Sequence, residues 1–147
     1  MLKVLIADDE EKICQLIIKL INWEEMGLKI AATASNGIEA LEQAKICKPE
    51  ILITDIRMPG IDGMELIRKV KEKLPDTEII IISGYRHFEY AQTAIRYGVR
   101  NYLLKPIKKE ELRDTLQKIA DIYREKNEQL NFEERVRLAL KNDAGKL

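Results

Sequence analysis

The sequence lacks an excess of charge, a long apolar run and any cluster of cysteines. Its 147 residues include 25 basic and 25 acidic side chains, a balance that argues against a surface for nucleic acid or an anionic membrane. The longest apolar runs have the length of strands, far below the ~20 residues of a membrane helix. No secretory signal is readable at the N-terminus. Cys14 and Cys47 are far apart and lack metal-ligand spacing, so we interpret them as reduced thiols of a cytoplasmic protein.

Short apolar segments alternate with helical patterns as far as about residue 107. An apolar fraction of 46% with 34% charged residues is normal for a globular protein with a buried core. Strands are predicted at Lys3–Ala7, Leu28–Ala34, Ile51–Thr54, Glu78–Ile82 and Asn101–Leu104. Because these are continuous Val, Ile and Leu runs, helices should cover both faces of the sheet. The sequence therefore predicts an α/β fold with a doubly wound parallel sheet and right-handed crossovers.

Apolar residues at helical spacing predict the helices between these strands. The expected inner faces are Ile13, Leu16, Ile17, Leu20 and Ile21 in the first helix, Ile38, Leu41 and Ala44 in the second, Met64, Leu66, Ile67 and Val70 in the third, and Ala91, Ala94 and Ile95 in the fourth. A stripe of Leu112, Leu116, Ile119 and Tyr123 predicts a fifth packing helix.

The pattern changes after this stripe. Lys126 and Asn127 interrupt it, so the fifth helix should leave the body of the domain after Tyr123. Asn131, with Glu134 three residues on, resembles a helix N-cap and is followed by Phe132, Val136 and Leu140 on one face. We therefore expect a domain at residues 1–125 and a helical linker or partner-binding segment at 126–147.

Four of the predicted strands end in a residue that can handle phosphate or magnesium. The first strand runs into Asp8, Asp9 and Glu10, and the others run into Asp55, Ser83 and Lys105. Ligands of an open parallel sheet bind outside the carboxyl ends of its strands. The sequence therefore predicts one site with a carboxylate cluster, a hydroxyl and an ammonium, the groups that a magnesium-dependent phosphoryl acceptor needs.

Each of these residues also has a simpler interpretation. Asp8 and Asp9 either bind an oxygen-liking metal or cap the helix that begins near Glu11. Asp55 can complete a Mg²⁺ site, together with the backbone carbonyl of Arg57, and act as a nucleophile, but a lone Asp after a strand is often a turn residue.

Ser83 and Lys105 decide between these interpretations. A hydroxyl and an ammonium neutralise charge in phosphoryl transfer. Taken singly, each has an ordinary role as a cap or a solvated loop lysine. Because both stand at strand ends of the same predicted sheet as the carboxylates, the joint interpretation is favoured.

These motifs resemble a known family. VLIADDE at 4–10, DIRMPG at 55–60, ISGY at 82–85 and KP at 105–106 are similar to the receiver domain of bacterial two-component response regulators. The resemblance covers about residues 1–125 and implies a flavodoxin-like, three-layer α/β/α fold with strand order 2-1-3-4-5. It implies that Asp55 is the phosphoacceptor, Asp8 and Asp9 the acidic pair that binds Mg²⁺, Ser83 the switch hydroxyl and Tyr102 the rotating aromatic. Lys105 would contact the phosphoryl group.

By this resemblance the partner is a sensor histidine kinase, and the chain is not an enzyme but a phosphoacceptor with self-catalysed phosphotransfer and autodephosphorylation. Movement of Ser83 toward the phosphoryl group would let Tyr102 turn inward and alter the surface formed by the fourth helix, fifth strand and fifth helix. Ser83 stands where Thr is more frequent, which preserves the hydroxyl, and Gly84 where Ala is more frequent. Tyr102 has an ordinary alternative as an edge-strand aromatic, and we interpret His87, the only histidine, as a loop or helix-start residue.

NWEEMG at 22–27 and SGYRHFEYA at 83–91 resemble the receivers of regulators with an AraC-type helix-turn-helix output. Such proteins imply a homodimer on phosphorylation, DNA contact only through a C-terminal domain absent from this chain, and no membrane. One alternative is a stand-alone receiver that acts in a phosphorelay or as a protein-binding switch. A third, an aspartate-nucleophile phosphatase, is disfavoured because its second Asp would stand where Arg57 does.

Overall fold

The computed structural model of the chain describes residues 1–84 and 88–145, so the interpretation of His87 lies outside the described residues. Strands and helices alternate in the order β1 (Leu2–Ala7), α1 (Glu11–Leu20), the 3-10 helix η1 (Glu24–Met26), β2 (Leu28–Ala34), α2 (Gly37–Cys47), β3 (Ile51–Thr54), α3 (Gly63–Lys73), β4 (Glu78–Ser83), α4 (Phe88–Arg96), β5 (Asn101–Leu104) and α5 (Lys109–Gly145). No helix in the described part of the chain is long and apolar enough to cross a membrane.

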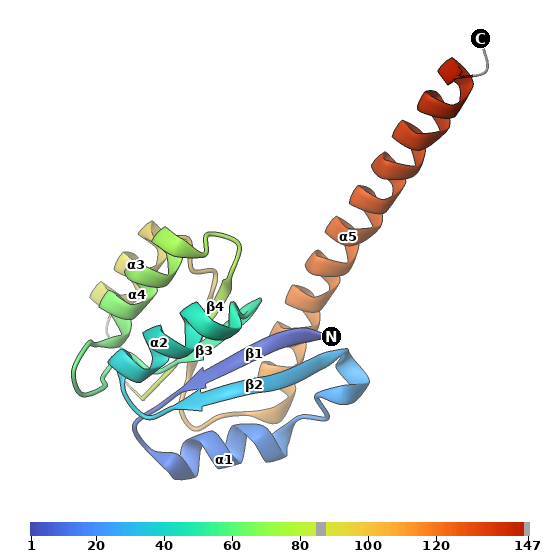
Figure 1. Cartoon of the computed structure of the whole chain (residues 1–147). Helices are drawn as coiled ribbons and strands as arrows, with labels where there is room; N and C mark the ends of the chain where they lie inside the picture. The colour runs from blue at the N-terminus through green and yellow to red at the C-terminus, as the bar shows by residue number, and fades with distance from the viewer. Residues whose placement is uncertain (85–87, 146–147) are drawn as a thin grey trace.

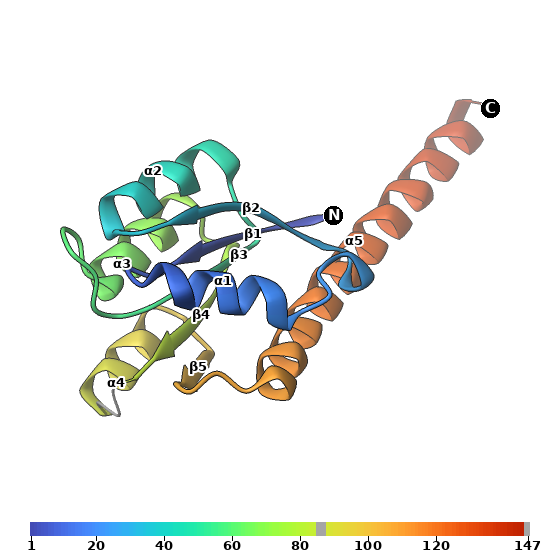
Figure 2. The same cartoon turned by 90° about the horizontal axis from the view of Figure 1, so that it is seen from below.

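The five strands form one parallel sheet in the order β2-β1-β3-β4-β5. Helices α1 and α5 cover one face, and α2, α3 and α4 cover the other (Figures 1 and 2). The predicted doubly wound α/β fold and its strand order are confirmed. In the register between β1 and β3, Ala7 lies opposite Thr54, so the residues that follow, Asp8 and Asp55, leave the sheet side by side.

The central strands are buried on both faces, as their continuous apolar runs indicate. Successive side chains of a strand point to opposite faces. Val4 and Ile6 therefore pack in the core beneath α1 and α5, whereas Leu5 and Ala7 pack in the core beneath α2, α3 and α4. Two cores thus hold the sheet rigid from both sides. The strand ends that carry the polar residues are therefore held in fixed positions.

Leu16 of α1 is 42% exposed, so its predicted place on the inner face is wrong, and two further predicted helix faces need correction. Ile38 is 51% exposed, while Ala40 and Ala44 are buried, so small residues form the inner face of α2. The Asn36 side chain accepts a hydrogen bond from the Glu39 N–H at 2.8 Å and sets where this helix begins. Ile38 instead leans over the loop after β3, within contact distance of Gly60.

The second correction concerns α4. Ala94 is buried as predicted, but Ile95 is 69% exposed. Ile95 lies about 100° around the helix from Ala94, on the side that faces away from the core. The side chain of Ala91 lies outside the described residues.

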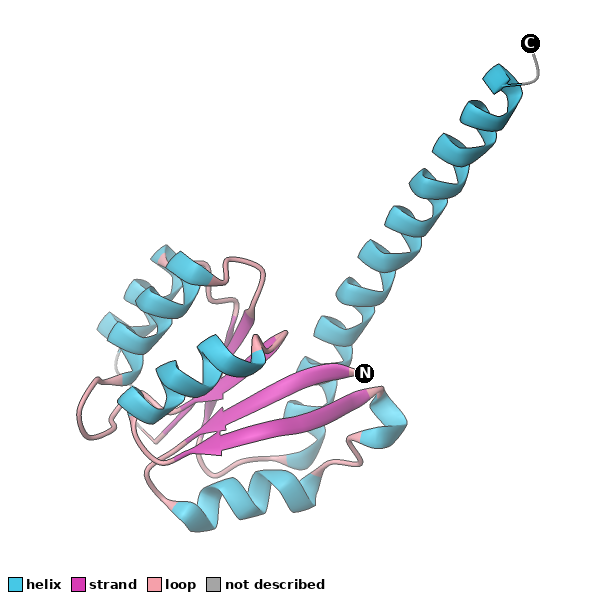
Figure 3. Cartoon of the chain, viewed as in Figure 1, coloured by secondary structure: helices cyan, strands magenta, loops and turns pink. Residues whose placement is uncertain are grey.

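Helix α5 is one continuous helix that leaves the body of the domain (Figure 3). Leu112, Leu116 and Ile119 are buried and Tyr123 is half-buried, whereas residues 124–142 are exposed. The predicted new helix start at Asn131 is wrong, because Asn131 lies inside α5. No Gly or Pro interrupts residues 124–131, so nothing in the backbone stops the helix there.

Candidate functional site

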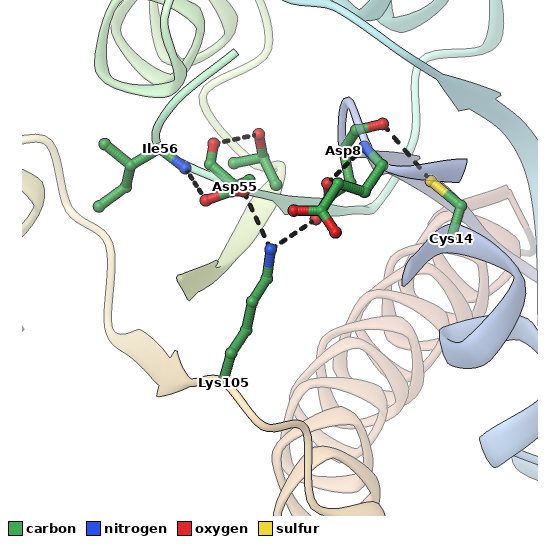
Figure 4. Close-up of polar contacts among 7 residues, drawn as sticks. Asp8, Cys14, Asp55, Ile56 and Lys105 are labelled. Carbon is green, nitrogen blue, oxygen red and sulfur yellow. Dashed lines mark hydrogen bonds and ion pairs between the residues drawn. The ribbon is translucent and has the colours of Figure 1, made fainter. Parts of the chain in front are cut away.

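The ends of β1, β3 and β5 meet at one ammonium group. The Lys105 Nζ lies 3.2 Å from an Asp8 carboxylate oxygen and 3.1 Å from an Asp55 carboxylate oxygen (Figure 4). Asp8 is 3% exposed and Asp55 6% exposed, so both carboxylates are held away from water. Asp8, Asp55 and Lys105 therefore converge as predicted, whereas Asp9 is exposed beside Asp8.

Asp55 is fixed by the backbone around it. Its N–H donates to the Ala7 carbonyl at 3.1 Å, and its Oδ1 accepts from the Ile56 N–H at 2.7 Å. Its Oδ2 faces Lys105. One carboxylate oxygen is thus used for positioning, and the other remains directed at the shared cationic centre.

The loop after β3 folds tightly against Asp55. The Gly63 N–H donates to the Ile56 carbonyl at 2.6 Å, and a Cβ at Gly63 would lie 2.1 Å from the Asp55 carbonyl oxygen. Only glycine permits this approach. Gly63 therefore supports the site, a role that the sequence analysis did not predict.

Asp8, Asp9 and Glu10 form a carboxylate cluster. Each offers a ligand oxygen, and these oxygens lie within 4.8 Å of one another. Asp8 is buried, and Asp9 and Glu10 are exposed. Glu10 was predicted to belong to this carboxylate cluster but not to the set of Mg²⁺ ligands.

The alternative in which Asp8 or Asp9 caps α1 is wrong. Glu10, not Asp8 or Asp9, occupies the N-cap position of α1, and it makes no side-chain cap. The Asp8 Oδ1 accepts from the Glu10 N–H at 2.9 Å, a local bond that leaves its other oxygen for Lys105.

The donor set suits a hard cation such as Mg²⁺. Mg²⁺ takes oxygen ligands, keeps several waters and uses one or two protein carboxylates. Asp8, Asp9 and Glu10 supply such oxygens, and Asp55 lies across Lys105 from Asp8. The exposed side of the cluster leaves room for water ligands, and the residues present therefore fit the ion. Arg57 lies in the exposed loop after β3, and the role of its carbonyl stays a prediction.

Burial and charge act in opposite directions on the ion-paired groups. Burial raises the pKa of Asp8 above its ordinary value, although the Glu10 N–H and the Lys105 ammonium act to lower it. For Lys105, burial alone would lower the pKa, but the hydrogen bond to Asp55 and the charges of both carboxylates outweigh it and raise the pKa. Lys105 is therefore fully charged at neutral pH, and the desolvation of Asp8 is the unfavourable part of the arrangement.

Ser83 and Tyr102 lie together beside this centre. Ser83 is fully buried, and its carbonyl accepts from the Lys105 N–H at 2.8 Å. Burial raises the pKa of the half-buried Tyr102 phenol, and a hydrogen bond with Ser83 acts in the opposite direction. The two predicted switch residues are thus in contact, next to the backbone that carries Lys105.

The cysteines remain apart from this chemistry. Both are free, and burial raises the pKa of the Cys14 thiol. Its Sγ lies 3.7 Å from the Asp8 carbonyl oxygen, which it contacts as a weak donor. Cys14 therefore packs beneath the acidic cluster as a neutral thiol.

Comparison with known proteins shows the family of the chain. Residues 4–117 match the response regulator receiver domain family. The transcriptional regulatory protein YesN of Bacillus subtilis, itself uncharacterized, is 40% identical over 139 residues, which are 90% of this chain and 38% of the relative. HptR, a transcriptional regulatory protein of Staphylococcus aureus, is 40% identical over 107 residues, 73% of this chain and 42% of the relative. The chain thus spans less than half the length of these relatives.

Solved structures resemble the chain over most of its length. The REC domain of AraT, a response regulator from Geobacillus stearothermophilus, is 41% identical with a TM-score of 0.82, covering 86% of this chain and 98% of that one. A two component transcriptional regulator AraC from Clostridium phytofermentans is 36% identical with a TM-score of 0.76, covering 82% of this chain and 94% of that one.

Proposed function

Because the chain belongs to the family of response regulator receiver domains, we propose that Asp55 accepts a phosphoryl group from a sensor histidine kinase. The observation that carries the proposal is the contact of one ammonium, Lys105, with both Asp8 and Asp55 at the carboxyl ends of the strands. A cation placed at the nucleophile neutralises the charge that phosphoryl transfer adds there.

The proposed step uses the Oδ2 atom of Asp55 as the nucleophile. This oxygen forms a bond to phosphorus while the bond from phosphorus to the kinase histidine nitrogen breaks, and the nitrogen keeps the electron pair and takes up a proton. The Oδ1 of Asp55 keeps the carboxylate oriented through the Ile56 N–H. Lys105 then pairs with a phosphoryl oxygen. The chain is thus an acceptor that catalyses its own phosphorylation and later loses the group to water.

Mg²⁺ would be held by Asp8, Asp9, Asp55 and the Arg57 carbonyl, the set that the family resemblance implies, and it supplies charge neutralisation at the transferred group when bound. Glu10 stands beside this set and orients it through its N–H contact with Asp8. The close packing of Gly63 against the Asp55 carbonyl keeps the acceptor from shifting along the loop.

The switch is proposed to begin with the contact between Ser83 and Tyr102. When the Ser83 hydroxyl moves to a phosphoryl oxygen, it leaves Tyr102, which turns inward and alters the surface of α4, β5 and α5. Tyr102 already packs at the edge of the core beneath α2, α3 and α4, which supports a short inward movement.

We propose that phosphorylation of this protein controls transcription and that the protein is cytoplasmic. The relatives are named as transcriptional regulators and are more than twice as long as the part they share with this chain. In this proposal residues 1–125 are the receiver, 126–147 lead toward an AraC-type DNA-binding domain, and phosphorylation drives homodimer formation. A stand-alone receiver is the weaker alternative, because such a protein would have no use for the exposed end of α5.

Intact mass spectrometry tests the phosphoacceptor directly. The chain is incubated with Mg²⁺ and acetyl phosphate, and the Asp55→Asn variant is compared with Asp62→Asn. Asp62 is a carboxylate of the same loop that caps α3, and Asn also caps helices, so this control should fold and label normally.

We expect the mass of one phosphoryl group on the chain and on Asp62→Asn, none on Asp55→Asn, and loss of labelling when Mg²⁺ is chelated. Sizing of the same samples checks for dimer formation. Equal labelling of Asp55→Asn would refute the assignment of the acceptor.

A further inference from the structure

The free-standing part of α5 begins immediately after Tyr123. Residues 124–142 are exposed, and from Arg124 to Gly145 the helix extends about 33 Å at 1.5 Å per residue (Figure 1). Most of the stability of a helix in a protein comes from the packing of one face, and residues 124–142 have no buried face. The contacts at its base therefore decide whether it continues the body as a rigid extension.

The exposed apolar residues of this part do not form one seam. At about 100° per residue, Leu130 and Leu138 lie toward the side that continues the buried stripe of α5. Phe132, Val136 and Leu140 lie on the opposite side, and all five are at least 41% exposed. Because the apolar surface is divided between two directions, it does not by itself fix the helix against a neighbouring surface.

Within the described residues, Tyr123 is the last residue of α5 that hydrogen-bonds to the body. Its hydroxyl donates its single proton in a three-centre hydrogen bond shared between the Glu50 carbonyl, at 3.2 Å, and the Asp76 carbonyl. These carbonyls belong to the α2–β3 loop and the α3–β4 loop. Both loops lie at the amino ends of the strands, whereas Asp55 lies at the carboxyl ends. One hydroxyl thus joins the base of the helix to two loops that are far apart in sequence.

The acceptors of Tyr123 are themselves held in place. Glu50 is anchored to β1, because its N–H donates to the Lys3 carbonyl at 3.0 Å and its side chain accepts from the Lys3 N–H. The Glu78 N–H donates to the same Glu50 carbonyl at 2.8 Å. The Thr77 hydroxyl donates to the Pro49 carbonyl at 2.7 Å, which ties the two loops together. Each acceptor also follows a proline, which stiffens its loop.

The Tyr123 ring is only partly enclosed by neighbouring side chains. A hollow of about 470 Å³ lies between α5 and the start of β1, and one of about 230 Å³ lies between the two loops; Tyr123 lines both. The Lys126 ammonium lies 5.7 Å from the ring centre. Because open space flanks the ring, the hydroxyl contacts carry much of its placement.

We propose that Tyr123 is a clamp that sets the direction in which α5 leaves the domain, through its hydroxyl and the joined α2–β3 and α3–β4 loops. The clamp makes residues 124–145 a rigid extension of the body. It also makes the orientation of residues 124–145 depend on those two loops, which lie at the amino ends of the strands, remote from the carboxylates. The proposal does not rest on the chemistry of Asp55.

Residual dipolar couplings of backbone N–H groups test this directly, since the whole chain is only 17.0 kDa. We expect residues 124–142 to share the alignment of the sheet in the unmodified chain. Tyr123→Phe keeps the ring and removes the hydroxyl, which should shift the balance between held and released helix about fivefold toward release. The couplings of residues 124–142 should then shrink and lose agreement with the sheet, while those of the five strands stay unchanged.

Two further variants make the test specific. Tyr97→Phe removes a hydroxyl from a tyrosine that packs in the other core and should leave the couplings of 124–142 unchanged. Thr77→Val breaks the tie between the loops without touching Tyr123, should cause the same loss in smaller measure, and serves if Tyr123→Phe does not fold.

Unchanged couplings in both Tyr123→Phe and Thr77→Val, or an equal loss in Tyr97→Phe, would overturn the clamp. So would an unmodified chain whose residues 124–142 do not share the alignment of the sheet. Labelling of Asp55 by acetyl phosphate, measured on the same samples, should be the same in all variants. A chain that fails to label would therefore count against the phosphoacceptor proposal and not against the clamp.

Discussion

Replacing Lys105 by Met leaves two buried carboxylates without their shared cation. Methionine keeps most of the length and apolar surface of the lysine side chain, so the change removes charge more than packing. Asp8 and Asp55 would then face each other at 3% and 6% exposure with only backbone N–H groups as partners. The variant therefore isolates the electrostatic contribution of the ammonium.

The expected loss is about 3 kcal/mol in the free energy of unfolding at pH 7 without Mg²⁺. Removing one partner of a buried ion pair costs roughly 3–5 kcal/mol. The lower end applies because the Lys105 side chain is 18% exposed and the site is open to water on one side. For a chain of this length, the loss corresponds to a fall of about 6–12 °C in Tm.

The pH dependence gives a second, independent signature. Because the pKa of Asp8 is raised in the folded state, protonation of this carboxyl stabilises the folded protein. This stabilisation is fully present below the pKa of the unfolded state and is lost as pH rises through the pKa of the folded state. Lys105→Met should raise the pKa of Asp8 further. The difference in the free energy of unfolding between the unmodified chain and Lys105→Met should therefore narrow as pH falls from 7 toward 4. The pKa of Lys105 is also raised, so the contribution of its charge is fully present below its ordinary value and is lost only as pH rises through the folded value.

Urea denaturation at several pH values measures both effects, with Lys108→Met as the control for a lysine of the same loop that is exposed. The control should stay within about 0.5 kcal/mol of the unmodified chain. The reasoning would be refuted by a Lys105→Met stability equal to that of the control at pH 7, or by a difference that does not narrow on acidification.

Three further changes should separate the supports of the site. Gly63→Ala places a Cβ 2.1 Å from the Asp55 carbonyl oxygen and should cost about 1–3 kcal/mol in urea denaturation and slow phosphoryl labelling; normal labelling would show that the loop yields freely. Asn36→Ala should cost about 1 kcal/mol by loss of the α2 cap, without any effect on labelling. Asp8→Asn should abolish the rise in Tm that Mg²⁺ causes, as measured by calorimetry, and an undiminished rise would remove Asp8 from the ligand set.

Much of the fold was predictable because its strands are unambiguous. Runs such as Ile51–Thr54 have no helical spacing and are bounded by turn residues, and each lies in the sheet as expected. Helix faces were less predictable. Ile38 and Ile95 have the residue type of a core position, but the fully buried positions of α2 and α4 are taken by Ala40, Ala44 and Ala94.

The sequence by itself determined which groups the site contains. Parallel strands present their carboxyl ends at one edge, so polar residues that follow four of them must gather there, whatever the details of packing. Tertiary structure alone decided the rest: the contact of Lys105 with two carboxylates, the approach of Gly63 to the Asp55 backbone, and the clamp of Tyr123 on two loops. These depend on distances between segments remote in sequence, and such distances are set by how the two cores pack, which no local pattern records.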